Sequence, residues 1–247
     1  MTRTLSNPEQ YSQHWKKESE FLDSHHIYEK LSKVTPIGNV LEVGCGAGFG
    51  TRHLSNGRNV LSLDSNPHLI MEAKEYLDSA TINHNIHKCD LFDLTNEDKF
   101  VIKTFNPKII VGWFIGSHGV DIFKHTEEEP GELEKSKLYR EKIEDIIASR
   151  DVCVCSVDYI HLVNRGGIVL GLPEDEYFNS TKDDYDTYVF NEIGFEVSDV
   201  KFIDWPREGS DFQYGQAPNP NLAEGESVPA ITSIIAKRVK NEHMANL

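Results

Sequence analysis

Short apolar runs alternate with amphipathic segments along the first half of the chain. Apolar runs bounded by glycine or polar residues suit buried strands, whereas apolar positions three and four apart suit helices packed on a sheet. The pattern predicts strands at about 39–43, 59–63, 82–89 and 108–115, with helices at about 47–56, 66–79 and 95–104. Such alternation favours an α/β fold, a parallel sheet with helices on both faces.

The first 36 residues are predicted to form a helical cap. Asn7 suits an N-cap and Pro8 a first helical position, so a helix should begin there and run through Phe21. A second helical stretch covers about 24–34. We expect one domain over 1–247, with a core at 37–240.

The second half has a less regular pattern. An insertion at about 116–131 is predicted to be a polar loop from Ser117 to Pro130, followed by a charged helix. The segment 152–157 suits either a strand or a buried helix, and its position favours a helix. The remaining predictions are a helix at 180–193, strands at 195–202 and 230–237, and an insertion at about 205–229 that is either a lid or a surface loop.

A glycine-rich turn follows the first predicted strand. Gly44, Gly46 and Gly48 permit a tight turn and a close approach of the backbone to a ligand, and the next helix would aim free N–H groups at it. The segment 40–63 contains no lysine, unlike a P-loop, and the third glycine comes one residue early for a dinucleotide site. Glu42 would repel a pyrophosphate but attract a cofactor that carries an ammonium and a sulfonium.

The segment Glu42–Gly48 resembles the first motif of the class I S-adenosylmethionine (SAM) methyltransferases, an acidic residue followed by x-Gly-x-Gly-x-Gly. The likeness continues with Asp64 and Asp90, each at the end of a predicted strand, and covers roughly 38–172. It implies a Rossmann-like, seven-stranded, mostly parallel sheet with a fifth strand at 166–170 and an antiparallel last strand.

The resemblance also implies which residues hold the cofactor, SAM. Glu42 to Gly48 would cradle the methionine part, Asp64 would accept hydrogen bonds from both ribose hydroxyls, and Asp90 with Leu91 would hold the adenine. The full set expected at the cofactor is Tyr11, Trp15, Glu42, Gly44, Cys45, Gly46, Gly48, Asp64, Ser65, Asp90, Leu91, Gly112 and Trp113. Tyr11 and Trp15 share a helical face, and the alternative is that they only dock the first helix on the sheet.

Catalytic candidates follow the fourth predicted strand, because ligands of open α/β sheets lie at the carboxyl ends of strands. His118 could be a general base, and Asp121 is the second catalytic candidate; the alternative for His118 is a polar loop residue facing solvent. A base is needed only where the methyl acceptor must lose a proton. The Asn/Asp-Pro-Pro-Tyr/Phe motif of adenine-modifying relatives is missing after this strand.

Composition narrows the partners. The formal net charge is −15 and no basic run exceeds two residues, so nucleic acid is less favoured than a small molecule or a protein side chain. No apolar run approaches the ~20 residues of a membrane span, and the N-terminus lacks the apolar core of a secretion signal. We therefore expect a cytoplasmic protein that does not insert into a membrane. The four cysteines lack metal-ligand spacing, and no metal is expected.

Three alternatives to a methyltransferase acting on a small molecule or side chain remain open from the sequence. They are an RNA methyltransferase with a local basic patch, a partner or sensor protein that binds SAM without turnover, and a dehydrogenase. The oligomeric state is open.

Overall fold

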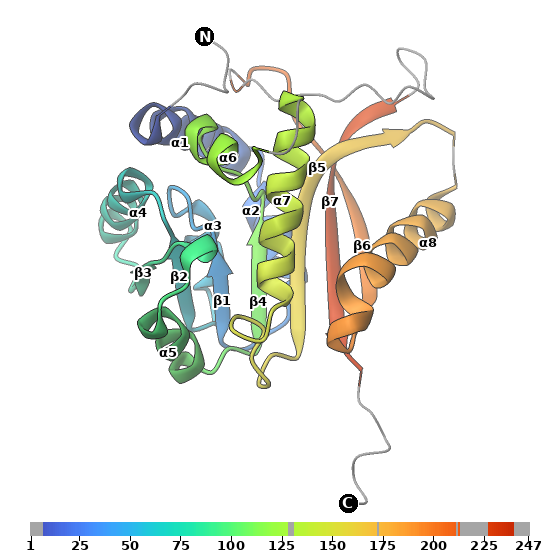
Figure 1. Cartoon of the computed structure of the whole chain (residues 1–247). Coiled ribbons are helices and arrows are strands. Elements are labelled where there is room, and N and C mark those ends of the chain that lie inside the picture. The colour runs from blue at the N-terminus through green and yellow to red at the C-terminus, as the bar shows by residue number, and fades with distance from the viewer. Residues whose placement is uncertain (1–6, 128–130, 172, 211, 213–226, 240–247) are drawn as a thin grey trace, which may run out of the picture.

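The computed structural model describes residues 7–127, 131–171, 173–210, 212 and 227–239. A seven-stranded sheet forms its centre, in the order β3-β2-β1-β4-β5-β7-β6 (Figure 1). The strands are β1 (Val40–Val43), β2 (Val60–Asp64), β3 (Ile86–Lys88), β4 (Ile109–Trp113), β5 (Tyr159–Val169), β6 (Phe195–Asp204) and β7 (Ser227–Arg238). The first five are parallel, and β7 runs antiparallel between β5 and β6, which confirms the predicted fold class.

Helices cover both faces of the sheet (Figure 1). They are α1 (Pro8–Ser24), α2 (Ile27–Val34), α3 (Phe49–Leu54), α4 (Pro67–Ser79), α5 (Asn96–Phe105), α6 (Gly119–His125), α7 (Glu132–Ala148) and α8 (Glu174–Tyr185), with short turns η2 (Leu91–Asp93), η3 (Asp186–Phe190) and η4 (Asn191–Ile193). Apolar side chains of α1 to α4 form one core, and those of α5, α6 and α7 form the other. Among the described residues, no helix has the length and apolar character needed to cross a membrane.

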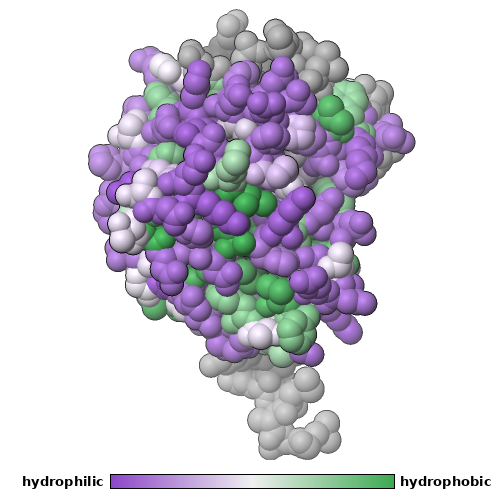
Figure 2. Space-filling model, turned by 90° about the vertical axis from the view of Figure 1, so that its left-hand side faces the viewer, coloured by the Kyte–Doolittle hydropathy of each residue, from purple (hydrophilic) through white to green (hydrophobic). Residues whose placement is uncertain are grey.

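The face at the β3 edge is mostly hydrophilic. Figure 2 shows this face, where hydrophobic residues come to the surface in a band across its middle and lower part. Isolated exposed apolar side chains such as Met71 on α4 and Phe100 on α5 are normal for a globular protein.

The predicted N-terminal helices are confirmed. The Asn7 side chain accepts a hydrogen bond from the Gln10 backbone N–H at 2.9 Å, and Pro8 opens α1, where its missing N–H costs nothing. The apolar sides of α1 and α2, including Leu22 and Leu31, are fully buried. This burial packs the two helices against the sheet.

The helix predicted at 152–157 is wrong. This segment is a series of turns in which Val152 and Val157 are buried. The Arg238 guanidinium, from the far end of β7, donates to the carbonyls of Val157 at 2.7 Å and Val154 at 3.3 Å, which satisfies backbone groups that a helix would have used internally. The strand expected at 166–170 begins earlier, at Tyr159.

Three other boundaries differ from the predictions. The loop expected from Ser117 to Pro130 contains α6, β3 covers only Ile86–Lys88, and the helix expected at 180–193 begins at Glu174 and ends in irregular turns. Residues 211 and 213–226 of the predicted insertion at 205–229 lie outside the described residues. They make up most of the segment for which a lid was one of two predictions.

Candidate functional site: a cleft at the strand tips

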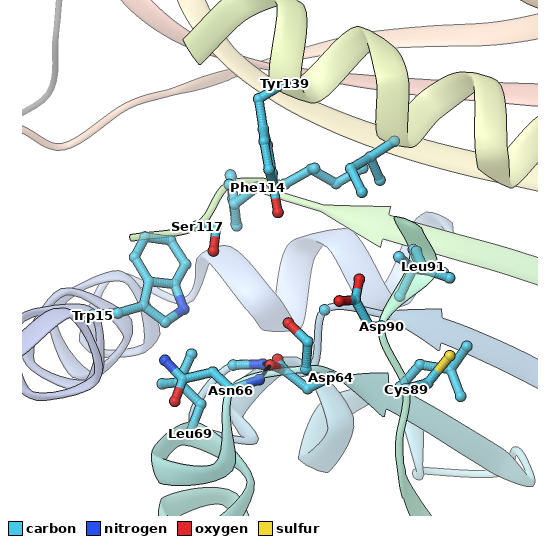
Figure 3. Close-up of a pocket in the computed structure, with 18 of the residues that line it drawn as sticks. Trp15, Asp64, Asn66, Leu69, Cys89, Asp90, Leu91, Phe114, Ser117 and Tyr139 are labelled. Carbon is cyan, nitrogen blue, oxygen red and sulfur yellow. Dashed lines mark hydrogen bonds between the residues drawn. The ribbon is translucent and has the colours of Figure 1, made fainter. Parts of the chain in front are cut away.

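A cleft lies at the carboxyl ends of β1 to β4 and encloses about 740 Å³, including its open mouth (Figure 3). From β1 the chain adds β2 and then β3 toward one edge of the sheet, and it then returns to place β4 on the other side of β1. The strand order therefore reverses between β1 and β4. Such a reversal point is where open α/β sheets bind ligands. The lining residues are Tyr11, Trp15, Val43, Gly44, Gly46, Leu63, Asp64, Ser65, Asn66, Leu69, Cys89, Asp90, Leu91, Phe92, Trp113, Phe114, Ile115, Gly116, Ser117, Tyr139 and Ile143.

The glycine turn forms the floor of this cleft. Gly44 has φ = 76°, and a Cβ placed on it would meet nothing within 4 Å, so any side chain there would occupy open cleft space. Gly46 has φ = 54°, and a Cβ on it would come within 2.6 Å of the Trp15 indole nitrogen. The turn therefore leaves a space that a bound molecule can fill, with α1 packed against its rim.

Asp64 ties the second strand to this turn. One carboxylate oxygen accepts from the Gly46 N–H at 3.0 Å, and the other accepts from the Asn66 N–H at 2.9 Å. Burial raises the pKa of Asp64 to about 6, although these backbone N–H groups lower it by a smaller amount. The Cys45 thiol also donates to the oxygen that accepts from Gly46, at 3.9 Å.

Asp90 has an equivalent position after the third strand. Its carboxylate accepts from the Phe92 N–H at 3.0 Å and caps the short turn η2, which places Leu91 on the cleft wall. In Figure 3 Asp64 and Asp90 both lie on the lower side of the cleft, at the tips of neighbouring strands. The cleft therefore contains two carboxylates in the arrangement expected from the sequence.

Glu42 lies behind the cleft and does not line it. It is 4% exposed, and one of its oxygens accepts from the Thr51 and Ser62 hydroxyls, each at 2.6 Å. Burial raises its pKa to about 7. Three other residues expected at the cofactor, Cys45, Gly48 and Gly112, are also absent from the lining.

His118 and Asp121, the catalytic candidates, do not line the cleft either. His118 is the N-cap of α6, where its Nδ1 accepts from the Asp121 N–H at 3.3 Å, and burial lowers its pKa. Asp121 accepts from the Tyr139 hydroxyl at 2.6 Å. Tyr139 is the member of this group that lines the cleft, and no motif in the sequence marks it within the predicted charged helix.

Aromatic rings cover one side of the cleft. Tyr11 and Trp15 stack with their ring centroids 6.4 Å apart, and Phe212 packs edge-on against Trp15 at 5.4 Å. The Arg165 guanidinium lies 5.2 Å from the Trp15 ring and 5.3 Å from the Phe114 ring. These contacts hold α1 against the sheet as well as presenting both predicted aromatic residues to the cleft.

Residues 40–107, which include the glycine turn and both aspartates, match the family model described as a methyltransferase domain. The chain carries a class I SAM-dependent methyltransferase domain. The cofactor of the methyltransferase is SAM. The open space at Gly44 and the carboxylates of Asp64 and Asp90 fit a cofactor of this kind, because its amino-acid part, ribose and adenine all offer hydrogen-bond donors.

Solved structures share the fold. The methyltransferase is similar to a chain of the complex between the Haloferax volcanii Trm112 methyltransferase activator and a methyltransferase, with 12% identity, a TM-score of 0.51, and coverage of 96% of this chain and 100% of that one. It also resembles magnesium protoporphyrin IX methyltransferase from Synechocystis PCC 6803 (12%, TM-score 0.47, 90% and 79%). A third similar structure is a TehB-like methyltransferase from Corynebacterium glutamicum (17%, TM-score 0.47, 94% and 100%). No curated protein matches this chain.

Proposed function

We propose that this methyltransferase transfers the sulfonium methyl group of SAM by in-line displacement to a small molecule or an amino-acid side chain. Gly44 and Gly46 hold the methionine part, Asp64 holds the ribose, and Asp90 with Leu91 holds the adenine. The observation that carries these roles is that all five residues line one cleft. The cofactor supplies the reactive carbon, so the chain has to orient both reactants and keep water away.

The lining of the cleft favours a small acceptor over a nucleic acid. Of the lining residues that the structure describes, none is a lysine or arginine that could pair with a phosphate backbone. The net charge of −15 supports the same choice over an RNA phosphate backbone.

Calorimetry with S-adenosylhomocysteine (SAH) and with NAD tests the cofactor site. We expect SAH to bind and NAD not to bind. Asp64→Ala should weaken SAH by ~1–3 kcal/mol, the range for hydrogen bonds to a charged group. Asp78→Ala, a change at an α4 carboxylate that is 74% exposed, should leave the affinity unchanged. Preference for NAD, or equal effects of the two variants, would contradict these roles.

Incubation with methyl-labelled SAM and separated cell fractions tests the acceptor. We expect label in the metabolite or the protein fraction. Label confined to RNA would support an RNA methyltransferase instead. No label in any fraction, from protein that binds SAH, would support a partner or sensor protein that binds SAM without turnover.

A further inference from the structure

The cleft extends beyond the strand tips into a second part, formed by Phe114, Ile115, Ser117, Tyr139 and Ile143, which we call the acceptor half. Three of these side chains are apolar, and the polar atoms of the other two side chains are hydroxyl oxygens. In Figure 3 Tyr139 extends from α7 on the opposite side of the cleft from Asp64 and Asp90, and its hydroxyl points toward Ser117. The polar end of the acceptor half is therefore this pair of hydroxyls.

The Tyr139 hydroxyl has its only proton engaged away from the cleft. It donates to Asp121 at 2.6 Å, and a carboxylate can only accept. Burial raises the pKa of Tyr139 well above its ordinary value, and the charge of Asp121 and its hydrogen bond raise it further. The phenol therefore stays neutral. Its oxygen also takes part in a hydrogen bond with the Ser117 hydroxyl, so what it can offer a ligand is its remaining lone pair. A ligand group at this position has to be a hydrogen-bond donor.

The charges around the cleft point the same way. Among the described residues that line it, none is lysine or arginine, while Asp64 and Asp90 line it and Asp121 lies directly behind Tyr139. The Arg165 guanidinium lies against the Phe114 and Trp15 rings, 5.3 Å and 5.2 Å from their centroids, and is not part of the lining. A carboxylate or phosphate at the Tyr139 oxygen would meet negative charge and a lone pair. A neutral or cationic group meets no such penalty.

We propose that the methyl acceptor is a neutral or positively charged molecule, or side chain, with an apolar body and an O–H or N–H group that donates a hydrogen bond to the Tyr139 oxygen. This inference rests on the proposed function, because it assigns the acceptor of the same cleft. Tyr139 is the specificity-determining residue, and Asp121 positions its hydroxyl.

The arrangement also accounts for the proton that such an acceptor loses. In the displacement, the bond from sulfur to the methyl carbon breaks with its electron pair going to sulfur, and a bond from the acceptor oxygen or nitrogen to that carbon forms. The acceptor proton passes to the Tyr139 oxygen while the Tyr139 proton passes to Asp121. Asp121 ends as a neutral acid, Tyr139 is again a phenol, and the positive charge of the sulfonium is cancelled.

Four probes that share one ring test this inference on the SAH-saturated protein: toluene, benzyl alcohol, benzylamine and benzoate. Ligand-observed NMR at pH 7.5 gives their dissociation constants, with the amine positively charged and benzoate negatively charged. Benzyl alcohol and benzylamine should bind about fivefold more tightly than toluene, the factor for a hydrogen bond worth about 1 kcal/mol. Benzoate should bind at least about tenfold more weakly than benzyl alcohol.

Matched variants assign the effect to Tyr139. Tyr139→Phe should remove the advantage of benzyl alcohol over toluene and leave toluene binding unchanged. Tyr188→Phe, at a tyrosine that is 78% exposed, should change neither. Asp121→Asn should reduce benzylamine binding more than toluene binding, because it removes the nearby negative charge. Thermal unfolding of each variant shows that it is folded, and the order of the four probes on the unaltered protein tests the inference independently of any variant.

Three results would overturn the inference: benzoate binding as tightly as benzyl alcohol, an alcohol-to-toluene ratio unchanged in Tyr139→Phe, or no probe binding at all. SAH binding is measured first. Protein that does not bind SAH refutes the proposed function, whereas protein that binds SAH but breaks the predicted probe order refutes only the assignment of the acceptor.

Discussion

The stability of the Glu42→Gln variant, measured relative to the unaltered protein, should be greater at pH 8 than at pH 5. Glu42 is buried behind the glycine turn and accepts two hydroxyl hydrogen bonds. These lower its pKa by less than burial raises it, and the charge of Asp64 raises it further. The folded protein therefore holds this carboxyl in an environment that disfavours its ionised form. Glutamine has nearly the same shape and cannot ionise.

The size of the effect follows from the pKa of Glu42. It is about 7 in the folded protein, compared with an ordinary value of 4.5, and each pH unit between the two corresponds to about 1.4 kcal/mol. Because the folded state holds the proton more tightly than the unfolded state, this group's contribution is fully present below pH 4.5. It is lost as the pH rises through 7. The total loss is about 3 kcal/mol.

Urea unfolding at a series of pH values from 5 to 8 measures this contribution. Titrating groups that do not interact with Glu42 affect both proteins equally, so the difference in free energy of unfolding between Glu42→Gln and the unaltered protein reports on Glu42 and its coupling to Asp64. The difference should shift in favour of the variant by about 2–3 kcal/mol over this range. Hydrogen-bond changes caused by the substitution add a constant and do not alter the trend.

A difference that stays constant from pH 5 to pH 8 would refute the reasoning. It would mean that Glu42 titrates alike in the folded and unfolded states and is in contact with solvent. A difference that moves in favour of the unaltered protein as the pH rises would show that a positive charge compensates the carboxylate.

Three further predictions concern the carboxylate of Asp64, the glycine turn and the buried histidine His161. In the unaltered protein, SAH should bind more weakly when the pH is lower than about 6, whereas Asp64→Asn should show no such loss. Burial raises the pKa of Asp64 to about 6, and a protonated carboxyl accepts hydrogen bonds less well. Calorimetry from pH 5 to 8 checks this. Gly44→Ala should abolish SAH binding. Gly57→Ala is the control, because Gly57 also has a positive φ (80°) and faces open space. Each substitution should lower stability by ~1–2 kcal/mol, but Gly57→Ala should keep full SAH affinity. Burial lowers the pKa of His161 to about 3, so stability that is present above pH 6.5 should be lost as the pH falls toward 3; acid unfolding of His161→Gln should show a weaker loss, and an identical acid limb would contradict this.

The meeting of Asp64 and Asp90 in one cleft could be predicted because its signals are local. Each of the first strands is a short apolar run, and Asp64 and Asp90 come at or just after the ends of β2 and β3. Parallel strands place these ends at one edge of the sheet, so the order of elements alone brings the aspartates to one cleft. Glu42 shows where local signals fail: two hydroxyls, from Thr51 and Ser62, hold its carboxylate behind the turn, and their positions depend on packing.

The turns at 152–157 depend on a distant contact. Their β-branched residues suit strand or buried helix equally, and local sequence offers nothing to decide between them. Arg238, 81 residues after Val157, donates to the carbonyls that shape the segment. A sequence pattern has no means of showing which carbonyls a remote guanidinium will reach.

His118 lies outside the cleft lining for a different chemical reason. An imidazole suits proton transfer near neutral pH, and this favoured His118, but the same ring also caps a helix, and the start of α6 uses it that way. Asp121, the other catalytic candidate, reaches the cleft only through Tyr139, 18 residues later on α7. The pairing arises where α7 packs beside α6, so neither helix carries the signal alone. Substitutions along the facing sides of α6 and α7 should therefore change which acceptor binds, while leaving SAH binding at the strand tips intact.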